Sequence, residues 1–232
     1  MTEHTYKPFD ADLEKLRALV LELGGMVESQ VLKAVTALAE HDGTLANEVI
    51  ATERQVDALE GSVDDLATQI IALRCPTAND LRMILTVARS ASDLERIGDK
   101  AVKIALYVHK MIDFDRLQSP RYNDIRFMSD LSLKMLREAL NAFARLDAHA
   151  ATDICRQDLQ VNEEFRHITR NLMTYMMEDP RTISTCIDLM FLVKAIERIG
   201  DHAVNIANYV VYMVEGKNVR HATPDEIEAQ LR

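Results

Sequence analysis

The chain has 232 residues, of which 48% are hydrophobic and 28% are charged, a composition typical of a globular protein. Seven glycines and five prolines are too few for a turn-rich β architecture, and eleven methionines suit helix packing. A net charge of −10, with no run of Lys and Arg, gives no support for direct binding to nucleic acid or to an anionic membrane.

Cysteine usage and hydropathy exclude further classes. The scattered Cys75, Cys155 and Cys186 show no C-x-x-C spacing, so neither a disulfide framework nor a zinc knuckle is predicted. The N-terminal segment MTEHTYKPFD lacks the apolar core of a signal peptide. The longest uncharged stretch, 202–214, is shorter than the roughly 20 residues that span a bilayer. We therefore expect no direct membrane insertion, so that any membrane association would go through a partner.

The first predicted helix begins near Asp10 or Asp12, and its apolar residues recur at spacings of three and four. It is expected to end at HDGT, residues 41–44. There Gly43 suits the left-handed position after a helix, and Thr44 suits the N-cap of the next helix.

The second helix is predicted to end at CPTAND, residues 75–80, because Pro76 disfavours the α conformation at Cys75. The third helix has the most regular pattern. Its core-facing positions are Ile84, Val87, Ala91, Leu94, Gly98, Ala101, Ala105 and Val108. A segment with a proline and several charges, 113–124, then separates two halves.

The second half repeats the plan of the first. Helices are predicted from near Asp124 to Arg145, from near Asp147 to Glu178, and from about Thr182 to Glu215 before Gly216. The sequence therefore predicts an all-α fold of two tandem, structurally similar three-helix bundles, covering residues 1–115 and 116–232.

One motif occurs in both halves. DLERIGDKAVKIA, residues 93–105, recurs as AIERIGDHAVNIA, residues 195–207, so equivalent positions differ by 102 (197 − 95). Gly98 and Gly200 both take core-facing positions. Because a glycine inside a helix costs about 1 kcal/mol relative to alanine, we expect another helix to approach closely at each.

Carboxylates follow core-facing positions on three of the helices. They are Asp57, Glu60, Asp64, Glu95, Asp99, Glu197 and Asp201, with Glu53 one turn before Asp57. Like charges four residues apart destabilise a helix by a few tenths of a kcal/mol, and a hard cation that prefers carboxylate oxygens would relieve this repulsion. The alternative is a solvated charged face balanced by basic side chains, such as Lys103 beside Asp99.

The two motif copies, together with ERQVDALE at 53–60, resemble the PhoU family of phosphate-signalling regulators over nearly the whole chain. The resemblance implies a pair of three-helix bundles that bind metal, iron or zinc, in clusters through E/D-x-x-x-D motifs. By position, the implied first site comprises Glu53, Asp57, Glu95 and Asp99. The implied second site comprises Asp158, Glu197 and Asp201, aided by His202. Asn162 stands where Asp57 stands in the first half, so the second site has one carboxylate fewer.

The same resemblance implies a function. PhoU-like proteins repress the phosphate-starvation response and restrain phosphate uptake. The chain is accordingly expected to be a metal-binding adaptor, and not an enzyme, that joins the ATPase subunit of a phosphate-specific ABC transporter to a sensor histidine kinase. A cytoplasmic homodimer, recruited to the inner face of the membrane through these partners, is expected.

Two alternatives remain open at this stage. A di-iron carboxylate enzyme would need two inward-facing E-x-x-H motifs, and the sequence has one candidate, Glu164 to His167. A metal-independent scaffold would use the acidic flanks to bind basic partner surfaces.

Overall fold

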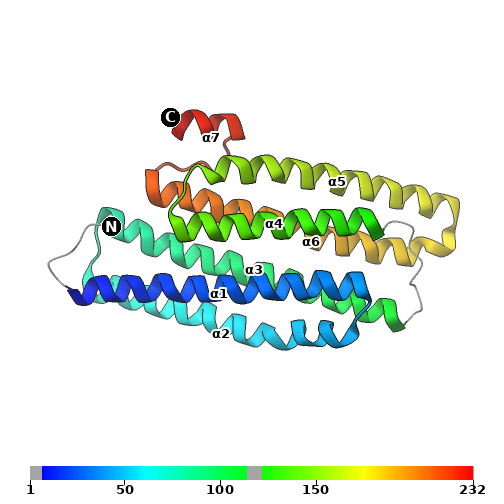
Figure 1. Ribbon diagram of the computed structural model, residues 1–232, viewed down its shortest axis with the longest axis horizontal. Coiled ribbons are helices and arrows are strands. Elements are labelled where there is room, and N and C mark those ends of the chain that lie inside the picture. Colours follow the sequence, from blue (N-terminus) through cyan, green and yellow to red (C-terminus); the bar gives the residue numbers. More distant parts are fainter. Residues whose placement is uncertain (1–6, 114–121, 232) are drawn as a thin grey trace.

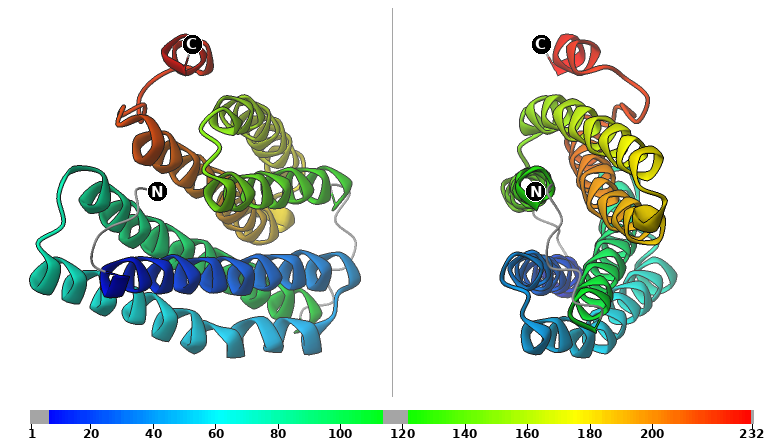
Figure 2. Two further views of the ribbon diagram at one scale, coloured as in Figure 1. Left: turned by 60° about the vertical axis from the view of Figure 1, so that its left-hand side comes forward. Right: turned by 90° about the vertical axis from the view of Figure 1, so that its right-hand side faces the viewer.

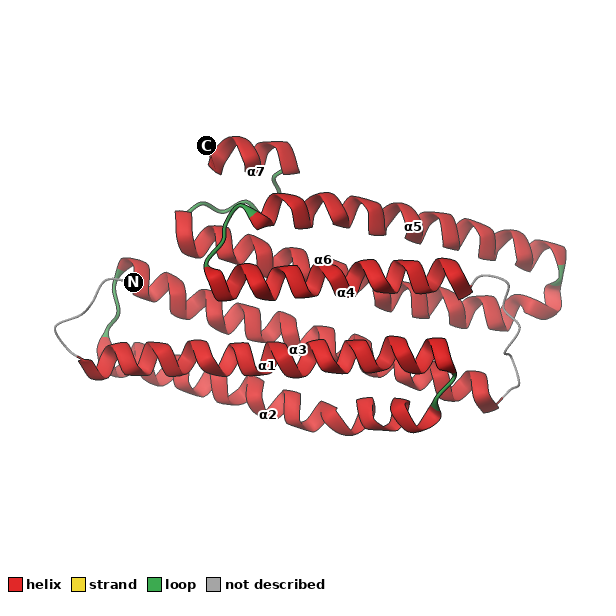
Figure 3. Cartoon of the chain, in the orientation of Figure 1, coloured by secondary structure: helices red, strands yellow, loops and turns green. Residues whose placement is uncertain are grey.

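The computed structural model describes residues 7–113 and 122–231, and every regular element within them is helical. Figures 1 and 3 show the long rods and their short connections. The elements are α1 (Lys7–Glu40), α2 (Gly43–Arg74), α3 (Ala78–Asp113), α4 (Tyr122–Arg145), α5 (Ala150–Glu178), a 3₁₀ turn (Pro180–Thr182), α6 (Ile183–Glu215) and α7 (Pro224–Leu231). The predicted all-α class is confirmed.

The turn between α1 and α2 differs from the prediction. His41 takes the left-handed conformation, with φ 57°. Asp42 is the N-cap of α2, and its side chain accepts hydrogen bonds from the backbone N–H groups of Thr44 and Leu45 at 2.8 and 3.1 Å. Gly43 is the first residue of α2, so the roles predicted for Gly43 and Thr44 are wrong. The aspartate one residue before the glycine competes successfully for the N-cap because its short carboxylate reaches two free backbone N–H groups.

Two other helix ends follow the prediction. Cys75, before Pro76, leaves the right-handed α region and is left-handed at φ 46°. Gly216 ends α6 at φ 70°, and its N–H donates to the carbonyl of Tyr212 at 3.0 Å. A proline and a glycine thus end these helices for the reasons that the sequence indicated.

The helices pack as two bundles, α1–α2–α3 and α4–α5–α6, which lie side by side in Figure 2. The short α7, which the sequence analysis did not predict, packs against α5. The bundles also pack on each other through α3 with α6 and through α1 with α4, where Arg137 Nε lies 2.7 Å from Glu28 Oε1. Buried apolar residues of both halves consequently form one continuous core. The predicted boundary between residues 115 and 116 falls outside the described residues.

Helices α3 and α6 run antiparallel across the junction of the bundles. Near one end Lys110 Nζ lies 3.2 Å from Asp188 Oδ1, and near the other His202 Nδ1 lies 2.6 Å from Asp93 Oδ1. Rising numbers on α3 therefore meet falling numbers on α6, and the two copies of the repeated motif cross side by side in opposite directions.

Candidate metal-binding clusters and the family of the chain

The two motif glycines serve packing to different degrees. A Cβ on Gly98 would lie 3.0 Å from Gln30 Oε1 on α1 and 3.3 Å from Val56 Cγ1 on α2. The predicted close approach of neighbouring helices is confirmed at this position. A Cβ on Gly200 would meet its nearest neighbours, Asp158 Oδ1 and a Met135 side-chain atom, at 3.6 Å, which is ordinary van der Waals contact.

In the second half, three predicted acids meet where α5 faces α6. Glu197 is 7% exposed, and Asp158 and Asp201 are half-buried. Asp158 Oδ2 accepts a hydrogen bond from Asn162 Nδ2 at 2.8 Å, while Oδ1 is buried without a hydrogen-bond partner among the described residues. Burial raises the pKa of Asp158 to about 6, and the charges of Asp201 and Glu197 add to the effect against the opposing Asn162 bond.

Basic side chains of α6 balance only part of this charge. Lys194 forms an ion pair with Glu197, and Arg198 Nη1 lies 3.7 Å from Asp201 Oδ2. The pKa of Asp201 is still raised, first by burial and then by Glu197, although the charges of Lys194 and Arg198 oppose the shift. The cluster Asp158–Glu197–Asp201, here called the α5–α6 cluster, therefore has uncompensated negative charge, most clearly at Asp158.

In the first half, carboxylates of α2 and α3 also lie close enough to affect one another's charge. The pKa of Glu95 is raised by burial, then by the nearby charges of Asp99, Glu60 and Asp57. The pKa of Glu60 is itself raised by burial and by two acids on its own helix. These residues, Asp57, Glu60, Glu95 and Asp99, are called the α2–α3 cluster. Lys103 makes no ion pair with Asp99 within the described part of the chain, so the balancing pair considered in the sequence is not formed.

The α2–α3 cluster differs from the implied first metal site by two residues, since it includes Glu60 and does not include Glu53. Glu60 belongs to the α2–α3 cluster although it was outside that set, and its position after the core-facing Leu59 was the available signal. Glu53 is half-buried on α2, one turn before Asp57. Glu60 follows a core-facing position of α2 as Asp57 does, which is how the sequence had already placed both acids on one flank of the helix.

His202 is bonded to an acid of the other bundle and not to the acids that it was expected to aid. Its Nδ1 lies 2.6 Å from Asp93 of α3, and Asn205 Nδ2 donates to the same oxygen at 3.2 Å. Burial, followed by the Asp93 charge and hydrogen bond, raises the pKa of Tyr209 to about 12. His202 thus joins the two bundles. The sequence contains one sign of this contact between the bundles. The two motif copies differ at their first position, where the first copy has Asp93 and the second has Ala195.

The side chains of the clusters are of the type that hard cations prefer, because mutually repelling carboxylates and the unpaired Asp158 oxygen would all gain from a positive charge. Across residues 7–113 and 122–231, however, no three His, Cys, Asp or Glu side chains converge on one point at which a metal ion could be held. A bound ion would thus require side-chain rotation within each cluster.

Comparison with known proteins identifies the family. The PhoU domain matches this chain twice, over residues 20–108 and 125–210. The chain belongs to the PhoU family. Both matched segments coincide with the two bundles, and the PhoU fold predicted from the repeated motif is confirmed.

The PhoU relatives match over nearly their whole length. The phosphate-specific transport system accessory protein PhoU homolog of Pseudomonas putida is 41% identical over 100% of this chain and 90% of its own length. The corresponding PhoU of Escherichia coli (strain K12) is 38% identical over 100% of this chain and 95% of its own. The crystal structure of PhoU from Pseudomonas aeruginosa is 42% identical, with a TM-score of 0.86 over 90% of this chain and 100% of that chain. That of the phosphate transport system regulatory protein PhoU from Streptococcus pneumoniae is 28% identical, with a TM-score of 0.83 over 91% of this chain and 99% of that chain.

Two further observations concern the remaining predictions. Among the described residues, none of the helices contains an apolar stretch of the length that a membrane span needs. The single E-x-x-H candidate does not face a bundle interior, since the side chain of His167 is 57% exposed and its Nδ1 lies 3.9 Å from Glu164 Oε2. The geometry expected of a di-iron carboxylate enzyme is therefore not formed by this pair.

Proposed function

We propose that this chain is a negative regulator of the phosphate-starvation response and of phosphate uptake. It acts as a cytoplasmic adaptor between the ATPase subunit of a phosphate-specific ABC transporter and a sensor histidine kinase, at the inner face of the membrane and as a homodimer. The observation that carries the proposal is the match, along the whole chain, to proteins named as accessory to the phosphate-specific transport system. The helical architecture supports it, since long rods offer extended surfaces for protein contacts.

Deletion of the gene tests the regulatory role. Loss of the protein should derepress phosphate-scavenging genes in phosphate-rich medium, because the repressing link between transporter and kinase is removed. Alkaline phosphatase activity provides the measurement, and re-expression of this chain should restore repression. Unchanged expression in the deletion strain would reject the role.

Metal binding is the second part of the proposal. The α2–α3 and α5–α6 clusters would hold iron or zinc, with the bound cation neutralising carboxylates that repel one another. Elemental analysis of protein purified without chelator or affinity tag should find metal in the wild type. E95Q/D99N and E197Q/D201N should each lose part of it, whereas a control with two exposed acids changed, E14Q/D130N, should keep the wild-type content.

A metal-independent scaffold is the second candidate, favoured by the lack of three converging ligands in the described residues. It predicts no stoichiometric metal in the wild type together with normal repression by all three double variants. Metal content and repression measured on the same set of variants thus separate the two candidates.

A further inference from the structure

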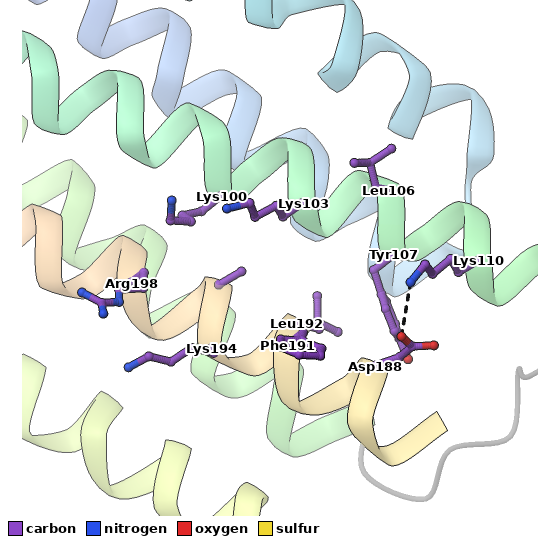
Figure 4. Close-up of a pocket in the computed structure, with 11 residues that line it drawn as sticks. Lys100, Lys103, Leu106, Tyr107, Lys110, Asp188, Phe191, Leu192, Lys194 and Arg198 are labelled. Atoms are coloured by element: carbon purple, nitrogen blue, oxygen red, sulfur yellow. Dashed lines mark hydrogen bonds and ion pairs between the residues drawn. The ribbon is translucent and has the colours of Figure 1, made fainter. Parts of the chain in front are cut away.

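A cationic groove lies between α3 and α6, at the end of their junction where Lys110 meets Asp188. Its volume is about 540 Å³. The basic residues that line it are Lys100, Lys103, Lys110, Lys194 and Arg198, and the one acidic residue among its lining is Asp188, which is bonded to Lys110. Figure 4 shows that the cations come from both helices. The chain as a whole has a net charge of −10, so this concentration of positive charge makes the groove the face on which an anionic group is favoured.

Two of these cations have no ion-pair partner within the described residues. They are Lys100 and Lys103, although the charges of Asp99 and Glu95 lie near Lys100. Lys194 and Arg198 have partners on α6 itself, Glu197 and Asp201. An incoming anionic group would therefore meet two ammonium groups on α3 that have no ion pair to be displaced.

The groove also has an exposed apolar part. Leu106 of α3 is 49% exposed and Phe191 of α6 is 73% exposed, while Leu192 and Ala195 are buried beneath them. A large aromatic side chain left in water beside a leucine is typical of a protein contact surface, since neither contributes to the core of the chain.

The internal repeat allows these residues to be compared with their equivalents at the other end of the junction. The opposite end of the α3–α6 junction has a second cavity, of about 420 Å³. Positions that are equivalent in the repeat differ by 102 residues. In the second cavity, the equivalents of Lys103, Leu106 and Lys110 on α3 are Asn205, Asn208 and Tyr212 on α6. The equivalent of Phe191 on α6 is Arg89 on α3. The same helix pairing thus forms with other residues at these positions, so a lysine, a leucine and a phenylalanine there are not a general requirement of the junction.

We propose that this groove binds an acidic amphipathic helix of a partner protein. The walls are two antiparallel helices, so a third helix can lie between them with apolar residues on Leu106 and Phe191 and carboxylates against Lys100 and Lys103. From Lys100 to Lys110 the wall is about 15 Å long, which accommodates about three helical turns. The concave shape favours a helix over a flat bilayer surface. The identification of that partner with the transporter ATPase or the kinase rests on the proposed function.

A synthetic peptide tests the groove directly. The probe is a fluorescent helix of about 14 residues, with Leu and Phe along one face and Glu on both flanks. Its anisotropy with the intact chain should show saturable binding that weakens as NaCl rises from about 50 to 300 mM. K103N/L106N, which introduces the residues that the other half of the chain carries, should weaken binding about tenfold or more. Circular dichroism should show unchanged folding.

The control variant is K15N/L32N, which removes one exposed lysine and one exposed leucine from α1 and should bind as the wild type does. A scrambled peptide of the same composition should not bind. Equal weakening by both variants, equal binding of both peptides, or no saturable binding would overturn the proposal. So would phosphatidylglycerol vesicles binding the wild type in place of the peptide.

Co-purification separates this inference from the proposed function. With the transporter ATPase and the kinase as baits, K103N/L106N should lose capture of one partner while K15N/L32N keeps both. Capture by both variants alike would overturn the groove and leave the adaptor role intact. If the wild type captures neither partner, the adaptor role fails and the peptide measurement alone decides the groove.

Discussion

Asp158 is held in an environment that disfavours its own charge. One carboxylate oxygen has a single amide donor, the other has no partner in the described residues, and two further acids lie nearby on α6. Its pKa therefore rises from an ordinary value of 3.8 to about 6. A residue placed in this way destabilises the metal-free fold at neutral pH, and a bound cation would reverse that effect.

Replacement of Asp158 by Asn tests this at the residue scale. The pKa of Asp158 is higher in the folded state than in the unfolded state. Its carboxylate therefore lowers the free energy of unfolding by the full amount above about pH 6 and by nothing below about pH 4. Two pKa units correspond to about 3 kcal/mol, and solvent screening of this partly exposed group reduces that to on the order of 1–2 kcal/mol. D158N should thus raise the free energy of unfolding by that amount near neutral pH, in urea titrations of chelator-treated protein.

The advantage of D158N should shrink by roughly half near pH 5. Glu163→Gln, which changes an exposed acid on the same helix, should alter stability by less than about 0.5 kcal/mol at either pH. A D158N variant that is less stable than the wild type, at all pH values, would contradict this account.

The motif glycines provide a second test at the same scale. Alanine gains about 1 kcal/mol over glycine inside a helix. Gly200→Ala should realise most of this gain because its Cβ finds ordinary contacts at 3.6 Å. Gly98→Ala should lose it, since Gln30 Oε1 at 3.0 Å and Val56 at 3.3 Å must both shift in a packed core. Thermal or urea unfolding should rank G200A above the wild type and above G98A; equal stability of the two variants would refute the packing argument.

At the scale of the element, the pairing of α3 with α6 depends on buried polar contacts as well as on apolar packing. Asp93 is 3% exposed and accepts hydrogen bonds from His202 and Asn205 of the other bundle. On folding, these donors lose their hydrogen bonds to water and form hydrogen bonds to Asp93 instead. Removal of Asp93 would leave them between two helices without an acceptor.

Asp93→Ala should therefore destabilise the chain by on the order of 3 kcal/mol, as the loss of one partner of a buried charged network does. Asp65→Ala, which changes an exposed acid of α2, should have less than about 0.5 kcal/mol effect on the same chemical denaturation curve. Asp93→Asn should fall between the two because it retains one acceptor oxygen. Equal behaviour of D93A and D65A would show that the network contributes nothing.

At the scale of the whole molecule, two similar bundles behave as one body. The cores of the two halves are continuous, and the α3–α6 contact between bundles is as extensive as contacts within them. When an interface is built like a domain core, neither half can open without exposing apolar surface of the other.

We accordingly expect a single unfolding transition. The chain has no Trp, so a tryptophan introduced at Leu73 in the first bundle or at Phe127 in the second reports on one half alone, and both positions are exposed. L73W and F127W should show urea midpoints that coincide with each other and with the loss of helical circular dichroism. Separate midpoints would mean that the bundles unfold independently.

Most of the helices and the duplication could be predicted because both depend on the spacing of residues along the chain. The three-and-four spacing predicted each long helix, Pro76 and Gly216 marked helix ends, and the repeated motif revealed the duplication and the family. The errors were also local: at 41–44 two adjacent residues compete for the cap, and Asp42 wins through contacts that single-residue preferences do not rank.

The sequence by itself determined the helices, their duplication and the flank on which the acids lie, since helical periodicity relates every position to its neighbours. Only the tertiary structure decided which carboxylates meet, that Glu60 joins the α2–α3 cluster, and that His202 turns to Asp93. It also brought Lys103 and Phe191 together in one groove. These outcomes depend on how two helices far apart in the chain are rotated and aligned against each other, and no spacing within either helix contains that information.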